Sequence, residues 1–138
     1  MDDCIFCKIV NGDIPANKIY EDNDFIAFHD IHPKAKIHVL VIPKKHIPTL
    51  MDITDEDDVT LIGKLHQVIQ TVVKKLEIDE KGFRVINNCR EDGGQEVFHL
   101  HYHVLGEKNY RSRKLTCQKQ YNIISSVILC FLQGISAW

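Results

Sequence analysis

The sequence lacks a strong net charge, a regular set of cysteines and a leader-like start. Its 17 Lys and Arg residues nearly balance its 19 Asp and Glu residues, and the net charge of −2 argues against a nucleic-acid partner. Five cysteines without a regular framework exclude a small secreted disulfide-rich domain and favour a reducing compartment, which we expect to be the cytoplasm. The acidic start at Met1–Cys4 has no basic and apolar stretch of the kind found in signal peptides.

The chain also has few glycines and prolines and no series of long apolar runs, which excludes a collagen and a multispanning membrane protein. What remains is ordinary for one globular domain. The 138 residues are 44% hydrophobic and 26% charged, which is too apolar for a disordered chain.

Charge divides the chain into two parts. Residues 1–106 hold 12 basic and 18 acidic side chains, whereas residues 107–138 hold 5 basic and 1 acidic. We expect the first part to form the domain and the second to be a C-terminal extension, first basic and then apolar. Its last 18 residues are uncharged, at the short edge of what spans a bilayer. Packing against the domain or a partner chain is favoured over membrane association or a poorly specified appendage.

Short strand-like segments around one long amphipathic segment predict an α+β domain with an antiparallel sheet. The long helix is expected over residues 54–76, with Thr54 as its N-cap and an apolar face at Ile62, Leu65, Ile69, Val72 and Leu76. A short helix within residues 3–10 should stop at Asn11-Gly12. The expected strands are Lys18–Glu21, Phe25–Asp30, Lys36–Ile42, Phe83–Asn87 and Val97–Leu105.

The last expected strand carries three histidines at strict alternation. On a strand, His99, His101 and His103 point to one face together with Val97 and Leu105. The other face is expected to be core, with Phe98, Leu100, Tyr102 and Val104. Three alternating imidazoles favour a working site over a solvated edge strand with chance histidines. Metal chelation and nucleophilic catalysis by imidazole both remain open at this point.

The segment Asn88–Gln95 precedes these histidines and contains the pair Gly93-Gly94. Glycines permit positive φ angles, so backbone N–H groups of such a turn can converge on an anion, although a plain hairpin turn has the same composition. A phosphate-binding loop beside neutral imidazoles suggests phosphoryl or nucleotidyl transfer through histidine.

The segment Asp92–Leu105 resembles the signature of the histidine triad (HIT) family, in which histidines alternate with apolar residues. The segments Cys4–Ile9, Phe28–Ile31 and His38–His46 are similar to the Hint branch of that family, and the match runs in order through residues 4–106. The resemblance implies a five-stranded antiparallel sheet with one long and one short N-terminal helix. It also implies a homodimer that binds purine nucleotides and has no organic cofactor.

The activity implied by the resemblance is hydrolysis of purine nucleoside 5′-phosphoramidates to AMP or GMP. His101 matches the nucleophile that forms a nucleotidyl-histidine intermediate, His103 a phosphate-contacting histidine, and His38 an auxiliary histidine that orients the nucleophile. The residues that match substrate-binding positions are Asp30, Asn88, Gln95, Val97, Ile5, Phe6, Ile9, Phe28 and Ile31. Plain core packing for the apolar residues, a turn role for Asp30 and a satisfied core histidine at His38 remain as alternatives.

The resemblance further implies a structural zinc site in bacterial-type members. Its ligands would be Cys4, Cys7, His46 and His99, a set that fits tetrahedral zinc, with two free thiols as the alternative. Glu96 departs from the serine that animal members carry near the leaving group, so the proton donor is left open. The alternative functions are dinucleoside polyphosphate hydrolysis, a regulatory nucleotide-binding module and a metal-binding protein that uses the three histidines.

Overall fold

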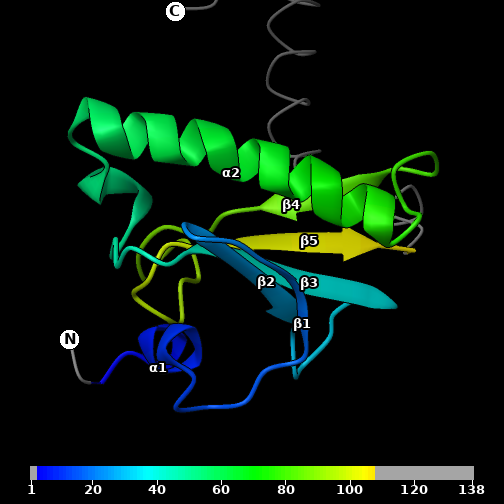
Figure 1. The fold of residues 1–138 in the computed structure, drawn as a ribbon, viewed down its shortest axis with the longest axis horizontal. Coiled ribbons are helices and arrows are strands. Elements are labelled where there is room, and N and C mark those ends of the chain that lie inside the picture. Colours follow the sequence, from blue (N-terminus) through cyan, green and yellow to red (C-terminus); the bar gives the residue numbers. More distant parts are fainter. Residues whose placement is uncertain (1–2, 108–138) are drawn as a thin grey trace, which may run out of the picture. The chain divides into compact units, whose positions relative to one another are not determined.

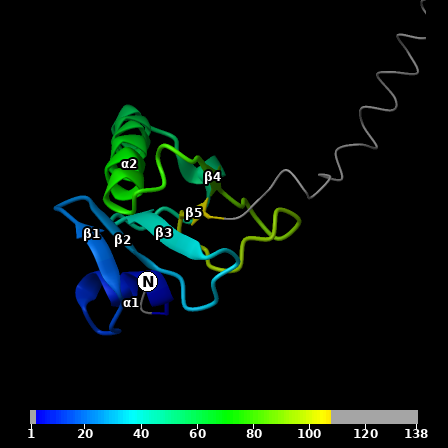
Figure 2. The ribbon, with the colours of Figure 1, turned by 90° about the vertical axis from the view of Figure 1, so that its right-hand side faces the viewer.

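The computed structural model describes residues 3–107, which form an antiparallel sheet with helices on both faces. Figures 1 and 2 show α2 along one face of the sheet and α1 against the other. The strand order is β1-β2-β3-β5-β4, so that β1 and β4 form the edges. The helices are α1 (Ile5–Asn11), the 3-10 turn η1 (Leu50–Asp52) and α2 (Glu56–Lys75), and the strands are β1 (Lys18–Glu21), β2 (Phe25–His29), β3 (Ile37–Pro43), β4 (Phe83–Ile86) and β5 (Tyr102–Gly106).

This architecture confirms the predicted α+β fold with a five-stranded antiparallel sheet, one long helix and one short N-terminal helix. The first four strands begin and end within a residue of their predicted bounds. The predicted N-cap of the long helix is wrong by one residue. Asp55 is the cap, because its carboxylate accepts a hydrogen bond of 2.7 Å from the Asp58 N–H.

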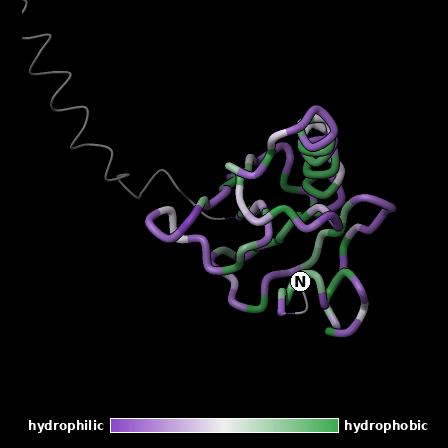
Figure 3. Tube along the Cα trace, turned by 90° about the vertical axis from the view of Figure 1, so that its left-hand side faces the viewer, coloured by the Kyte–Doolittle hydropathy of each residue, from purple (hydrophilic) through white to green (hydrophobic). Residues whose placement is uncertain are grey.

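The two faces of the sheet bury separate apolar clusters, because alternate side chains of a strand point in opposite directions. One cluster packs under α2 and includes Ala27, Val39 and Val41. The other packs against α1 and includes Phe28 and Leu40. Figure 3 shows hydrophobic stretches in the interior of the domain and hydrophilic residues in the outer loops.

The histidine-bearing strand is shorter than predicted. β5 begins at Tyr102, and residues 97–101 approach it without strand pairing. The reason is that this segment bonds elsewhere: the Leu100 N–H donates to the Ile47 carbonyl oxygen at 2.6 Å, and the His99 N–H donates to the Val97 carbonyl oxygen. Leu100 is nevertheless core, as predicted, whereas Phe98 is 47% exposed and the prediction that it is core is wrong.

Among residues 3–107, the structure contains no helix that is both long and apolar enough to cross a membrane. The predicted C-terminal extension, residues 107–138, lies outside the described residues from residue 108 onward. The domain boundary at residue 106 therefore stays a prediction.

Candidate active site

A cavity of about 850 Å³ opens on the α1 face of the sheet. Strands β3 and β5 contribute His38 and His103, and the segment before β5 contributes His101. The structure brings to this cavity all of the predicted catalytic and substrate-binding residues except Gln95. Those that line it are His38, His101, His103, Asp30, Asn88, Val97, Ile5, Phe6, Ile9, Phe28 and Ile31.

His101 is held with one ring nitrogen bonded and the other available. Its Nδ1 lies 2.7 Å from the carbonyl oxygen of His99. A carbonyl oxygen only accepts, so Nδ1 carries the proton and Nε2 keeps its lone pair in the neutral ring. Burial lowers the pKa of His101, although the carboxylates of Asp30 and Glu96 act in the opposite direction. The ring is therefore a neutral imidazole that lines the cavity, which is the form a nucleophile needs.

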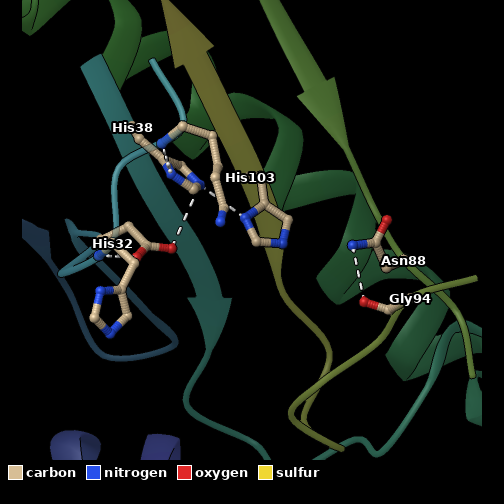
Figure 4. A network of polar contacts seen from close by, with 7 residues as sticks. His32, His38, Asn88, Gly94 and His103 are labelled. Atoms are coloured by element: carbon tan, nitrogen blue, oxygen red, sulfur yellow. Dashed lines mark hydrogen bonds and ion pairs between the residues drawn. The ribbon is translucent and has the colours of Figure 1, made fainter. Parts of the chain in front are cut away.

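His38 and His103 form a hydrogen-bonded pair beside it. The Lys34 N–H donates to His38 Nδ1 at 3.1 Å, so the neutral His38 ring carries its proton on Nε2. That Nε2–H donates to His103 Nδ1 at 2.9 Å, and Figure 4 shows the two labelled rings facing one another. Burial lowers the pKa of His103 to about 4, with further lowering by His101 and His38, so this ring is also neutral.

Asp30, which directly follows β2, lies beside this pair of histidines. Its Oδ2 lies 3.4 Å from His38 Nε2, and its Oδ1 accepts a hydrogen bond of 2.7 Å from the His32 N–H. Asp30 therefore takes part in a turn and also lines the cavity. The ligand atoms of Asp30, His38 and His103 lie within 4.8 Å of one another, the spacing of a metal site. However, both ring nitrogens of His38 already take part in hydrogen bonds, with the Lys34 N–H and with His103 Nδ1, so the three residues are not arranged as a ligand set.

The predicted phosphate loop borders the cavity through Asn88, Gly94 and Val97. Asn88 Nδ2 donates to the Gly94 carbonyl oxygen at 3.3 Å, drawn in Figure 4, and Gly94 has a φ of +75°. A Cβ at Gly93 would collide with the carbonyl oxygen of Cys89, so the close approach of the chain there requires glycine.

Gln95 is buried in the same loop but is not part of the cavity lining. Its Oε1 accepts a hydrogen bond from the Arg90 N–H at 2.8 Å, and its Nε2 donates to the carbonyl oxygens of Pro48 and Val97. These bonds fix the shape of the loop. Contact between Gln95 and a substrate stays a prediction without support from this position.

The apolar wall of the cavity belongs to the apolar cluster that packs against α1. Phe6, Ile9 and Phe28 are buried there and line the cavity as well, so they serve the core and the site together. Ile5 is 44% exposed and Ile31 is 83% exposed, which places both at the rim.

Sequence reasoning missed several residues of the site. The connection between α1 and β1 lines the cavity with Ile14 to Asn17, and Lys34 lines it after β2. Asn87 is a further omission: its Nδ2 donates to the His101 carbonyl oxygen at 2.8 Å. Its Oδ1 is the one buried side-chain polar atom without a hydrogen-bond partner in the described part of the chain. The only sequence signal was its place beside Asn88.

The predicted metal ligands converge on one another, and none of them lines the cavity. Ligand atoms of Cys4, Cys7, His46 and His99 all lie within 4.8 Å of one another. The two Nδ1 atoms of His46 and His99 are 3.2 Å apart. His99 Nδ1 lies 3.6 Å from each Sγ, and Cys7 Sγ lies 3.2 Å from His46 Nδ1.

These spacings fit a tetrahedral ion. Bonds of about 2.05 Å to nitrogen and about 2.3 Å to sulfur place tetrahedral ligands about 3.3 Å apart for two nitrogens and about 3.6 Å apart for nitrogen and sulfur. His99 Nε2–H donates to the Pro43 carbonyl oxygen at 2.8 Å, which leaves the Nδ1 lone pair pointing at the cluster. Burial lowers the pKa of His99 to about 4, so the ring is in the neutral form that binds metal. Burial and the neighbouring Cys4 raise the pKa of Cys7.

Comparisons with known proteins show the family and the fold of this chain. The model of the HIT domain matches residues 11–110. An uncharacterized HIT-like protein of Helicobacter pylori is 46% identical over 106 residues, which cover 76% of this chain and 98% of that protein. Two solved structures also match. A histidine triad protein from Clostridium difficile has 49% identity and a TM-score of 0.78, and the match covers 83% of this chain and 98% of the other. A HIT family hydrolase from Legionella pneumophila has 41% identity and a TM-score of 0.74, and the match covers 78% of this chain and 95% of the other.

Proposed function

Because this chain belongs to the HIT domain family, we propose that it is a nucleotide-binding hydrolase that cleaves the P–N bond of purine nucleoside 5′-phosphoramidates. The observation that carries the proposal is the state of His101. Its Nδ1 is bonded to the His99 carbonyl oxygen, so its Nε2 lone pair is available to a phosphorus atom bound in the cavity.

The reaction has two displacements. In the first, His101 Nε2 forms a bond to phosphorus, and the electron pair of the P–N bond goes to the departing nitrogen, which takes up a proton and leaves as an amine. In the second, a water oxygen attacks phosphorus, the pair of the P–Nε2 bond returns to the imidazole, and water gives up a proton. The nucleoside monophosphate is then released, and one difficult displacement has become two easier ones.

The neighbours of His101 support these steps. The Nε2–H of His38 fixes His103 Nδ1 as an acceptor, so the neutral His103 ring presents an Nε2–H donor to a phosphate oxygen. Asn88 and the loop ending at Val97 border the same region and supply further donors. The apolar wall of Phe6, Ile9 and Phe28 suits a purine base.

Asp30 suits the ribose hydroxyls. Its carboxylate is held by the His32 N–H and retains lone pairs for two further hydrogen bonds. A diol that donates both protons to such a carboxylate is fixed in position relative to His101.

The charges of the cavity favour this substrate over a dinucleoside polyphosphate. Among the described lining residues are two carboxylates, Asp30 and Glu96, one lysine, Lys34, and no arginine. A chain of several phosphates carries a negative charge on each, which this lining does not balance. A phosphoramidate carries one negative charge, which the neutral imidazole and loop donors can stabilise.

Incubation with adenosine 5′-phosphoramidate tests the proposal. We expect release of AMP and, by mass spectrometry of protein quenched in alkali, an AMP adduct on His101 that is lost in acid. Binding of AMP without turnover would instead identify a regulatory nucleotide-binding module. Activity that a chelator abolishes and added metal restores would identify a metalloenzyme.

The cluster of Cys4, Cys7, His46 and His99 is proposed to hold zinc in a structural role. The ligand spacing and the orientation of His99 Nδ1 support this. When bound, zinc would tie the N-terminal residues to the segment that precedes His101, outside the cavity. Elemental analysis of the purified protein should find one zinc ion per chain.

A homodimer and a cytoplasmic location complete the proposal. At the edge strand β4, Phe83 and Val85 each expose 38% of their surface, which suits burial against a second copy. The thiols of Cys4, Cys7 and Cys89 are not paired in disulfides, which suits a reducing compartment. Light scattering should give twice the mass of the 15.9 kDa chain.

A further inference from the structure

Glu96 is an acidic residue at the cavity that the proposed steps do not use. Its side chain is exposed and lines the cavity, so it stands at the mouth rather than in the interior. The residues on both sides are fixed. Gln95 is buried and held by three hydrogen bonds, and Val97 packs against the apolar cluster that lies on α1. The backbone therefore holds this carboxylate at a defined place on the rim.

Glu96 and Asp30 both act on His101 but come from different segments of the chain. Asp30 directly follows β2, and Glu96 lies in the connection between β4 and β5. Both carboxylates act on His101 electrostatically, and of the two only Asp30 also acts on His103. Asp30 is engaged by the His32 N–H and by His38. Glu96 is thus the carboxylate that faces the solvent side of the nucleophile.

We propose that Glu96 selects among leaving groups by their charge. The site then prefers phosphoramidates whose departing amine bears an additional, positively charged group. This inference rests on the proposed function. In a displacement at phosphorus the amine leaves toward solvent through the mouth, where the carboxylate attracts a cation and repels an anion. Glu96 takes part in no bond change: the P–N electron pair and the proton go to the departing nitrogen as before.

The size of the preference follows from the exposure to solvent of the ion pair between the Glu96 carboxylate and the cationic group of the amine. Exposed ion pairs contribute about 0.2–1 kcal/mol, which converts to a preference of about 1.5-fold to fivefold for the cationic amine over a neutral one of the same length. Salt screens such pairs, so the preference should shrink as the ionic strength rises.

Three adenosine 5′-phosphoramidates of matched length test this, with 4-aminobutyl, pentyl and 3-carboxypropyl groups on the nitrogen. For the unmodified protein we expect kcat/KM to decrease in that order. In Glu96→Gln the three values should converge, and in Glu96→Lys the order should reverse. Glu91→Gln is the matched control, because Glu91 is an exposed acid of the same loop that does not line the cavity. It should keep the order of the unmodified protein.

Identical ratios in the unmodified protein and in Glu96→Gln would overturn the inference while leaving the proposed function intact. Absence of turnover with all three compounds would instead overturn the proposed function. Calorimetric binding of the same compounds to His101→Asn, with and without Glu96→Gln, then decides the charge preference separately. Tighter binding of the aminobutyl compound that depends on Glu96 supports the inference, and equal binding of all three contradicts it.

Discussion

This domain has two groups of histidines, one in the Cys/His cluster and one at the cavity, and they use opposite ring nitrogens. His99, in the cluster with Cys4, Cys7 and His46, donates from Nε2 to the Pro43 carbonyl oxygen and presents the Nδ1 lone pair. His101, two residues later, donates from Nδ1 to the His99 carbonyl oxygen and presents Nε2.

Backbone carbonyl oxygens therefore determine how each of these rings can act. A neutral imidazole has one donor and one acceptor nitrogen, so a carbonyl at one nitrogen determines which lone pair remains. The same residue type is therefore suited to bind a metal at one position and to act as a nucleophile at the other. The two groups are also connected, because the metal-type ligand His99 supplies the carbonyl that orients His101.

Replacing His101 should have the strongest effect on activity. His101→Asn removes the proposed nucleophile, and we expect hydrolysis to fall by at least about a thousandfold with the zinc content unchanged. His66→Asn is the control, since His66 is an exposed histidine on α2 outside the cavity. Phosphoramidase assays and elemental analysis of both variants check this, and full activity in His101→Asn would contradict the role of the ring.

The second prediction concerns the Cys/His cluster and the stability that a bound metal would add. Cys7→Ser should abolish zinc binding and lower stability by about 4 kcal/mol when free zinc is about a thousandfold above its dissociation constant. Cys89→Ser, in which a thiol outside the cluster is changed, should keep both properties. Thermal unfolding with and without chelator measures the difference. If chelator does not shift the unfolding of the unmodified protein, no structural metal is present.

The third prediction concerns how the His103 ring makes the stability of the domain depend on pH. Burial, His101 and His38 lower its folded-state pKa to about 4, and the opposing carboxylate of Asp30 is outweighed. The unfolded chain has a pKa near 6.5 and binds more protons between about pH 4 and 6.5. The stability contributed by this ring is therefore complete above pH 6.5 and decreases as the pH falls, by up to about 1.4 kcal/mol per pH unit.

Nitrogen NMR of the imidazole rings measures this pKa directly. The pH dependence of unfolding should become shallower in His103→Asn, because the variant loses one titrating group. A His103 ring that titrates near pH 6.5 in the folded protein would show that water reaches it.

The smallest expected effect concerns the backbone of the nucleophile. Asn87→Ala removes the hydrogen bond to the His101 carbonyl oxygen, which contributes about 0.5–1.5 kcal/mol, and kcat should fall by about twofold to tenfold. Asn23→Ala, in the turn between β1 and β2, is the control and should leave kcat unchanged. An equal change in both variants would indicate a general loss of folding rather than a positioning role.

Much of the fold was predictable because side-chain direction follows the periodicity of helices and strands. The burial of Leu65, Ile69 and Val72 follows from their helical spacing, and that of Leu100 and Val104 from alternation. The exposure of Phe98 was not predictable in the same way, since residues 97–101 bond to a distant loop instead of a strand. Periodicity describes an element but not where that element ends.

Local sequence patterns were enough to predict the two faces of the sheet, the amphipathic helix and the motif that places histidines beside a glycine-containing loop. Tertiary structure alone decided three other features: which nitrogen each histidine presents, that Gln95 shapes the loop instead of lining the cavity, and that Asn87 holds His101. The physical reason is distance along the chain. Cys4 meets His99 across 95 residues and His99 meets the Pro43 carbonyl across 56, and no local pattern encodes which donor reaches which acceptor through space.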